Sequence, residues 1–209
     1  MKFKRVLAPA IALVAVTSLA ACSNDADPGH DMASMSSTTE AEEQETPAEG
    51  DMFNQQDMMF AQMMVPHHEQ AIEMSDVILA KDGVDAQITD LANQIKDAQG
   101  PEIEQLNTWL EEWGSPMPES DSMDHESMGH GSMDGMMSEE DMQALQDAQG
   151  AEAGRLFLEQ MIVHHQGAIE MAQTEVDEGK HEDAVAMAQQ IVETQQDEIS
   201  TMEDLLASM

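Results

Sequence analysis

The sequence predicts an all-α protein, an antiparallel four-helix bundle made of two repeated helical hairpins. Apolar residues recur with a helical period in four long segments, and one of these stretches occurs twice. FAQMMVPHHEQAIEM at residues 60–74 recurs as FLEQMIVHHQGAIEM at residues 157–171, and the segment that follows each copy is repeated as well. A single hairpin cannot cover its own apolar stripe, so we expect the two halves to pack together as one domain. Hairpins exchanged between two chains are the alternative, and the oligomeric state stays open.

The first hairpin, residues 51–115, contains two predicted helices. One covers about residues 51–80 and ends before Gly83, and the next covers about residues 85–113 and ends at Gly114. At about 100° per residue, the paired histidines of the first helix lie on or at the margin of its packing face. The second helix carries Gln99 and Glu102 in its apolar stripe. A buried carboxylate is costly without a partner, so we expect Glu102 to meet a cation, a histidine or water.

The second hairpin, residues 139–209, repeats this pattern. Ser138 with Asp141 predicts a capped helix start, and the helix continues to about residue 177 with an interruption expected near Gly150. The last helix covers about residues 182–207, and Gln195 and Glu198 take the places of the inward Gln and Glu of the first hairpin. The polar residues are therefore duplicated together with the histidines.

The N-terminus has the features of an export signal. Three basic residues are followed by an apolar run that is too short to span a membrane and that ends in Leu-Ala-Ala-Cys. This ending resembles a bacterial lipobox, which predicts a lipoprotein signal peptide at residues 1–21 and a lipid anchor on Cys22. An ordinary cleaved signal with an incidental cysteine is the alternative. Residues 22–50 have the composition of a disordered tether, so we expect a cell-envelope lipoprotein on the outer side of the cytoplasmic membrane, which meets the membrane through its anchor only.

The charge balance limits the possible partners. The chain has 43 acidic and 7 Lys or Arg residues, for a formal net charge of −36. Such a charge repels nucleic acid and anionic lipid and favours cations, although acidic surfaces also serve solubility. Charge alone names no ligand.

The repeated stretch carries candidate metal ligands. Thioether sulfur selects soft ions, above all Cu(I), and imidazole also binds copper. The chain has a single cysteine, which argues against a metal site built from thiolates, so His, Met and carboxylates must hold any metal. The candidate ligands are Met64, His67, His68, Met74, Met161, His164, His165 and Met171. The alternative is that the methionines fill the core and that the histidines are satisfied by Gln99, Glu102, Gln195 and Glu198, which are also possible ligands.

Two further features bear on copper. Residues 116–138 form a predicted loop with an unusual density of Met and His, which favours copper capture over a low-complexity linker. Its candidate ligands are Met123, His125, Met128, His130 and Met133. Pro66 precedes the first histidine pair inside a helix, where Val163 precedes the second, so we expect a kink at Pro66 and two sites of different geometry and affinity.

These motifs resemble domain-of-unknown-function family 305. The resemblance lies in the Phe, Met, Pro-His-His or Val-His-His, and Ala-Ile-Glu-Met steps, followed by a helix with Gln and Glu-Ile, over roughly residues 51–113 and 149–206. It implies an exported ferritin-like bundle, since the family consists of such proteins, some linked to copper binding and copper tolerance. It also implies that the Met and His residues of both repeated stretches are the functional positions. Val163, in place of the proline, and Gly154, in place of Asp57, are departures in the second copy.

The sequence therefore predicts a copper-binding protein that sequesters copper or passes it to a copper-handling partner. We expect no enzyme, because no nucleophile, phosphate loop or cofactor motif is present. One alternative is a ferritin-like two-metal oxidase in which Glu102 and Glu198 face His67 and His164 across the bundle. A helical interaction module that uses no metal is another.

Overall fold

The computed structural model describes residues 52–115 and 135–209. Within these ranges the chain forms five α-helices: α1 (Gln55–Leu79), α2 (Ala86–Glu112), α3 (Glu139–Asp147), α4 (Gly150–Glu178) and α5 (Glu182–Ser208). The predicted all-α fold is confirmed. The predicted signal peptide, the tether, Cys22 and the five loop ligands between Met123 and Met133 lie outside the described residues.

Side-chain caps explain where the helices begin. Asn54 and Asp57 form a reciprocal capping box at the start of α1, and Ser138 and Asp141 form the predicted one at the start of α3. Asp85 caps α2 by accepting a hydrogen bond from the Gln87 amide. These bonds satisfy backbone N–H groups that have no partner within the helix.

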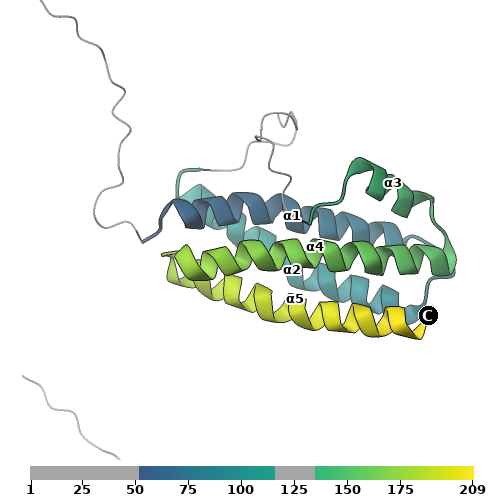
Figure 1. The fold of residues 1–209 in the computed structure, drawn as a ribbon. Coiled ribbons are helices and arrows are strands. Elements are labelled where there is room, and N and C mark those ends of the chain that lie inside the picture. The colour runs from purple at the N-terminus through teal and green to yellow at the C-terminus, as the bar shows by residue number, and fades with distance from the viewer. Residues whose placement is uncertain (1–51, 116–134) are drawn as a thin grey trace, which may run out of the picture. The chain divides into compact units, whose positions relative to one another are not determined.

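The long helix predicted from Ser138 to about residue 177 is two helices. Ala148 and Gln149 are extended, and Gly150 has a φ of 56°, so the chain turns between α3 and α4. The short α3 then lies over α1 and α4 (Figure 1). The break falls at the expected position near Gly150, but it creates a separate fifth element. α1, by contrast, continues without interruption through Pro66.

The four long helices pack as two hairpins. α1 packs on α2 and α4 packs on α5, while α1 and α4 join the hairpins to one another (Figure 1). α2 and α5 make only sparse contacts. None of the described helices is long and apolar enough to cross a membrane.

The core consists of two apolar clusters. The first contains Met74, Ile78 and Ile88 of the first hairpin with Phe157 and Met161 of the second. The second cluster combines Phe60, Met64, Leu106 and Trp109 with Ala168, Ala172 and Ile191. Each cluster thus draws on both hairpins, and burial of this apolar surface holds them together. Along α1 and α4, the paired histidines lie between the residues of the two clusters.

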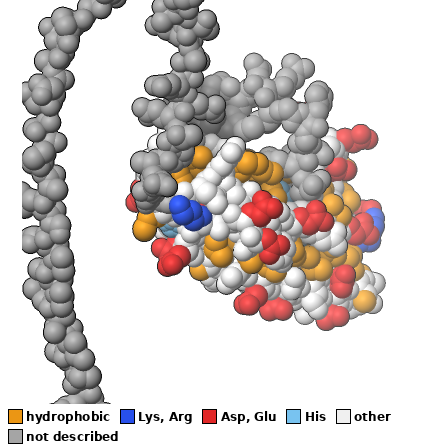
Figure 2. Space-filling view, turned by 60° about the vertical axis from the view of Figure 1, so that its left-hand side comes forward, with side chains coloured by type: hydrophobic (Ala, Val, Ile, Leu, Met, Phe, Trp, Pro, Cys, Tyr) orange, Lys and Arg blue, Asp and Glu red, His pale blue; other side chains and the backbone are white. Residues whose placement is uncertain are grey.

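The outer surface is strongly acidic. Figure 2 shows Asp and Glu side chains spread over the visible face among apolar and neutral ones, with few basic side chains. This distribution agrees with the formal net charge of −36 and attracts cations.

Candidate metal site

Four buried histidines form a polar layer in the middle of the bundle. His67, His68, His164 and His165 are all fully buried. The rings of His67 and His164 face one another across the α1–α4 contact, with centroids 3.8 Å apart and planes tilted by 42°. Because these are equivalent residues of the repeat, the hairpins meet about an approximate twofold arrangement. We call these four residues the histidine layer.

The outer histidines are bound to carboxylates of their own hairpin. Nε2 of His68 lies 2.9 Å from Oε2 of Glu102, and Nε2 of His165 lies 2.6 Å from Oε2 of Glu198. The expectation that Glu102 meets a histidine is confirmed. The alternative in which Glu102 and Glu198 pair with His67 and His164 is wrong. Adjacent residues of a helix point about 100° apart, and it is the second histidine of each pair that faces the glutamate.

These contacts fix the state of the outer rings. A carboxylate accepts hydrogen bonds, so Nε2 of His68 and of His165 carries the proton and donates it. In the neutral form of each ring the lone pair is then on Nδ1, and neither Nδ1 atom has a hydrogen-bond partner among the described residues. Carboxylates orient metal-binding histidines in this way in many proteins.

Several other buried polar side-chain atoms of the bundle lack hydrogen-bond partners in the described part of the chain. Both ring nitrogens of His164, both side-chain amide atoms of Gln99, and Oε1 of Gln195 have no hydrogen-bond partner of normal geometry. Each such group costs about 1–3 kcal/mol of folding free energy. The two glutamates therefore bind histidines, whereas the side-chain amide of Gln99 has no hydrogen-bond partner among the described residues.

Burial also sets the charge of His164. Desolvation lowers the pKa of His164 well below its usual value, and the nearby rings of His67, His165 and His68 lower it further. The imidazole is consequently neutral at physiological pH. Neutral imidazole is the form that binds metals.

The candidate methionines flank the layer in a different arrangement from the predicted one. Met64, Met74 and Met161 are fully buried, and Met171 is partly buried. Met64 and Met171 belong to one apolar cluster, whereas Met74 and Met161 belong to the other. The structure thus groups thioethers from opposite hairpins, rather than Met64 with Met74 within one hairpin. Periodicity could not show this, because it gives a helix face and not the partner across it.

The end of the predicted loop is docked on the bundle close to this layer. The side-chain amide of Gln70 donates to the carbonyl of Met137 at 2.9 Å and accepts from its backbone N–H at 2.7 Å. A Cβ on Gly135 would lie 2.7 Å from the carbonyl oxygen of Val163. Residues 135–137, which we call the docked strap, therefore cross from α4 to α1 at positions one turn or less from His164 and His67.

Sequence reasoning missed a buried carboxyl pair at the start of α1. Asp57 accepts hydrogen bonds from the backbone N–H groups of Lys180 and His181 at 3.0 and 2.8 Å, which ties α1 to the α4–α5 turn. Burial would raise the pKa of Asp57, but hydrogen bonds from Glu175 and from backbone amides lower it overall. Burial and the neighbouring Asp57 raise the pKa of Glu175 to about 8. In the sequence, the only sign of this pair was the capping pattern of Asn54 and Asp57, which marks Asp57 as a residue at the start of a helix.

A family comparison agrees with this architecture. The model of the domain of unknown function DUF305 matches residues 57–206. The chain belongs to the DUF305 family. The resemblance predicted from the His-His and Ala-Ile-Glu-Met motifs is thereby confirmed. No curated protein matches the chain significantly.

Solved structures of DUF305 proteins share the fold. A protein of Streptomyces coelicolor, described as secreted, is 31% identical over 73% of this chain and 91% of its own, with a TM-score of 0.64. A fragment from Deinococcus radiodurans is 33% identical over 76% of this chain and 100% of its own, with a TM-score of 0.65. CopM in the Cu(I)-bound form is 29% identical over 73% and 96%, with a TM-score of 0.60. CopM is also known in Cu(II)-bound and silver-bound forms.

Proposed function

We propose that this DUF305 protein binds copper, as Cu(I), in the histidine layer and sequesters it or passes it on. The observation that carries the proposal is the buried pair of His67 and His164, which face one another at 3.8 Å between methionine-containing clusters. Neutral imidazole and thioether donors without thiolate favour Cu(I) over harder ions. The Cu(I)-bound relative CopM supports the choice of metal.

The ligands are shared between the hairpins. His67 and His164 supply the central nitrogens, and Nδ1 of His68 and of His165 are further donors whose rings the glutamates orient. The thioethers come from the two flanking pairs, Met64 with Met171 and Met74 with Met161. One joint centre thus replaces the two separate sites that the repeat suggested. Gln99 and Gln195 are buried as well and are the alternative ligands.

Export and loop capture complete the proposal. The signal sequence and the secreted Streptomyces relative support an extracytoplasmic location, with Cys22 as the lipid anchor. Met123, His125, Met128, His130 and Met133 supply a second set of soft ligands in the segment that leads to the docked strap. A copper-handling protein is the expected partner for transfer.

The geometry supports binding over oxidase chemistry. Glu102 and Glu198 each contact the outer histidine of their own hairpin, so they orient ligands rather than bridge two metals at the central pair. Within residues 52–115 and 135–209, no three or more His, Cys, Asp or Glu side chains are grouped so that they could hold a metal, so the proposed copper centre needs thioether donors beside its histidines. Fe(II) preference with oxygen consumption would contradict the proposal and favour the oxidase.

Anaerobic titration with Cu(I) against a competing chromophoric chelator tests the proposal. We expect a His67→Ala, His164→Ala variant to lose the tightest site, and a deletion of residues 120–133, which spares the docked strap, to lose weaker sites only. His181→Asn is the matched control, because it removes an imidazole outside the layer and keeps a residue that can cap α5. Unchanged stoichiometry and affinity in the double variant would contradict the proposed centre.

A further inference from the structure

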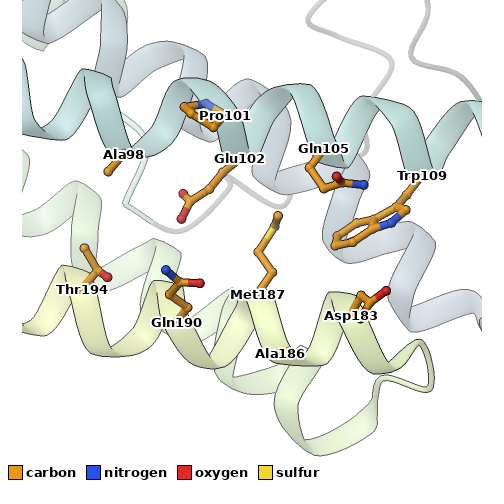
Figure 3. Close-up of a pocket in the computed structure, with 10 residues that line it drawn as sticks. All are labelled: Ala98, Pro101, Glu102, Gln105, Trp109, Asp183, Ala186, Met187, Gln190 and Thr194. Carbon is orange, nitrogen blue, oxygen red and sulfur yellow. The ribbon is translucent and has the colours of Figure 1, made fainter.

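An open groove lies between α2 and α5, on the opposite side of the bundle from α1 and α4, which the docked strap crosses. Its volume is about 560 Å³, and α2 and α5 contact one another only sparsely along it. Figure 3 shows Glu102 and Trp109 reaching into the groove from α2, and Met187 and Gln190 from α5. The groove thus brings a carboxylate and a thioether to a water-accessible place outside the histidine layer.

Glu102 connects this groove to the buried histidines. Its side chain lines the groove and is 17% exposed, while its Oε2 lies 2.9 Å from Nε2 of the fully buried His68. One side chain therefore has water on one side and a member of the histidine layer on the other. An ion held at this carboxylate would be one residue away from the layer.

Met187 supplies a soft donor at the same place. Its side chain is partly exposed, and Figure 3 shows it extending from α5 toward α2 between Glu102 and Trp109. A thioether binds Cu(I) and Ag(I) but has little affinity for the hard cations that an acidic surface also attracts. Met187 with Glu102 therefore combines selectivity for soft ions with negative charge.

The second hairpin does not repeat this combination. The residue equivalent to Met187 in the repeat is Leu91, which is 3% exposed and packs in the apolar core. Glu198 binds His165 as Glu102 binds His68, but the groove is lined by Glu102 and not by Glu198. The groove chemistry is thus restricted to the His68 side.

We propose that the α2–α5 groove is a capture site for a soft monovalent cation. The thioether of Met187 and the carboxylate of Glu102 hold the ion, which then passes by way of His68 to the histidine layer. This inference rests on the proposed copper binding by that layer, and it adds a second, surface site with a route inward. The acidic surface raises the local concentration of cations at the mouth of the groove.

The groove contains a tryptophan whose fluorescence can report on ion binding. Trp109 lines it, and Trp113 is the only other tryptophan of the chain, with its ring stacked 5.9 Å from that of Trp109. In a Trp113→Phe background, stopped-flow mixing with Ag(I) should therefore give a fast fluorescence quench from the groove, followed by a slower change as the ion moves inward. Met187→Leu should slow the fast phase severalfold. Met187→Lys, which adds a positive charge, should slow it by about tenfold or more.

Measurements of Ag(I) affinity at equilibrium test the histidine layer, whereas the rate of Ag(I) loading tests the capture site. Met187→Leu should leave the Ag(I) stoichiometry and affinity of the histidine layer unchanged, because a residue on the route alters rates only. Met59→Leu is the matched control, since it removes an exposed thioether outside the groove and should leave both phases intact. Glu102→Gln should slow loading more than Glu198→Gln. Far-ultraviolet circular dichroism and thermal unfolding check that each variant is folded.

Two results would overturn the capture site while leaving the proposed function in place. One is an unchanged fast phase in both Met187 variants, and the other is equal slowing by Glu102→Gln and Glu198→Gln. Absence of Ag(I) and Cu(I) binding by the parent protein at equilibrium would instead remove the proposed function, and the capture site with it.

Discussion

Adjacent histidines in each repeated stretch have different surroundings. The outer residues, His68 and His165, are held by Glu102 and Glu198, whereas the rings of the inner residues, His67 and His164, face one another. Such a core is less stable than an apolar one, because buried polar atoms such as the ring nitrogens of His164 make no hydrogen bond of normal geometry within residues 52–115 and 135–209. Such a cost is typical of a site built for a ligand.

The first prediction uses this difference between neighbours. His164→Leu removes two buried ring nitrogens that make no hydrogen bond of normal geometry within the described residues, so we expect the metal-free protein to gain about 1 kcal/mol in free energy of unfolding. His165→Leu is the control with the opposite sign, because it leaves Glu198, whose side chain is only 13% exposed, without its histidine partner and should cost about 1–3 kcal/mol. Urea unfolding with and without Ag(I) measures both. A destabilised His164→Leu that keeps the full stabilisation by Ag(I) would contradict the assignment.

The second prediction concerns the buried carboxyl pair. The pKa of Glu175 in the folded protein is raised to about 8 from a usual value of 4.5. The folded state therefore keeps a proton that the unfolded state has released, and this contribution to stability is complete below pH 4.5 and is lost as the pH rises to about 8. Glu175→Gln does not titrate, so its stability relative to the parent should rise across this window by up to about 1.4 kcal/mol per pH unit.

Urea unfolding of both proteins at intervals between pH 5 and pH 8.5 measures this difference. The amide of Gln is neutral and can donate a hydrogen bond as protonated Glu175 can, so the variant removes the titration without adding a charge. A constant difference between the two proteins over the whole range would mean that Glu175 is not protonated in the folded state.

At the scale of elements, helical periodicity predicted the long helices well. α1, α2 and α5 begin and end within a few residues of the predicted limits, because each has a continuous apolar stripe and a turn signal at its end. The separate α3 was less visible, since its break rests on the backbone of Ala148 to Gly150 and not on a change in the apolar pattern. The docked strap could not be predicted, because Gln70 binds it through the backbone of Met137.

The third prediction tests the docked strap. Gly135 has a φ of 86°, and a Cβ there would lie 2.7 Å from the carbonyl oxygen of Val163. Gly135→Ala should therefore destabilise the fold both through its backbone angle and through this clash. Gly114→Ala is the matched control, because Gly114 has a φ of 72° and nothing within 4 Å of the added Cβ. We expect Gly135→Ala to cost about 1–3 kcal/mol more than the control in urea unfolding. Equal losses would show that the strap adapts without strain.

At the scale of the whole molecule, the repeat predicted inward histidines on two equivalent helices but suggested two separate sites. The packing of α1 on α4 instead brings like residues together, as the facing rings of His67 and His164 show. The helical projection could not choose between adjacent histidines as the partner of Glu102, since both lie near the same face. The cross-hairpin grouping of Met64 with Met171 likewise depends on the packing of α1 on α4, which periodicity does not contain.

The shared core leads to the last prediction. Both apolar clusters and the histidine layer draw residues from both hairpins, so neither hairpin should keep its full helical content alone. We expect residues 52–115 and 135–209, produced separately, to show weak far-ultraviolet circular dichroism at low concentration, and their equimolar mixture to recover helicity and Ag(I) binding. A mixture in which the second hairpin carries His164→Leu should regain helicity without the tight site. If each hairpin is fully helical and monomeric by sedimentation, its core is self-contained, and the joint centre loses its physical basis.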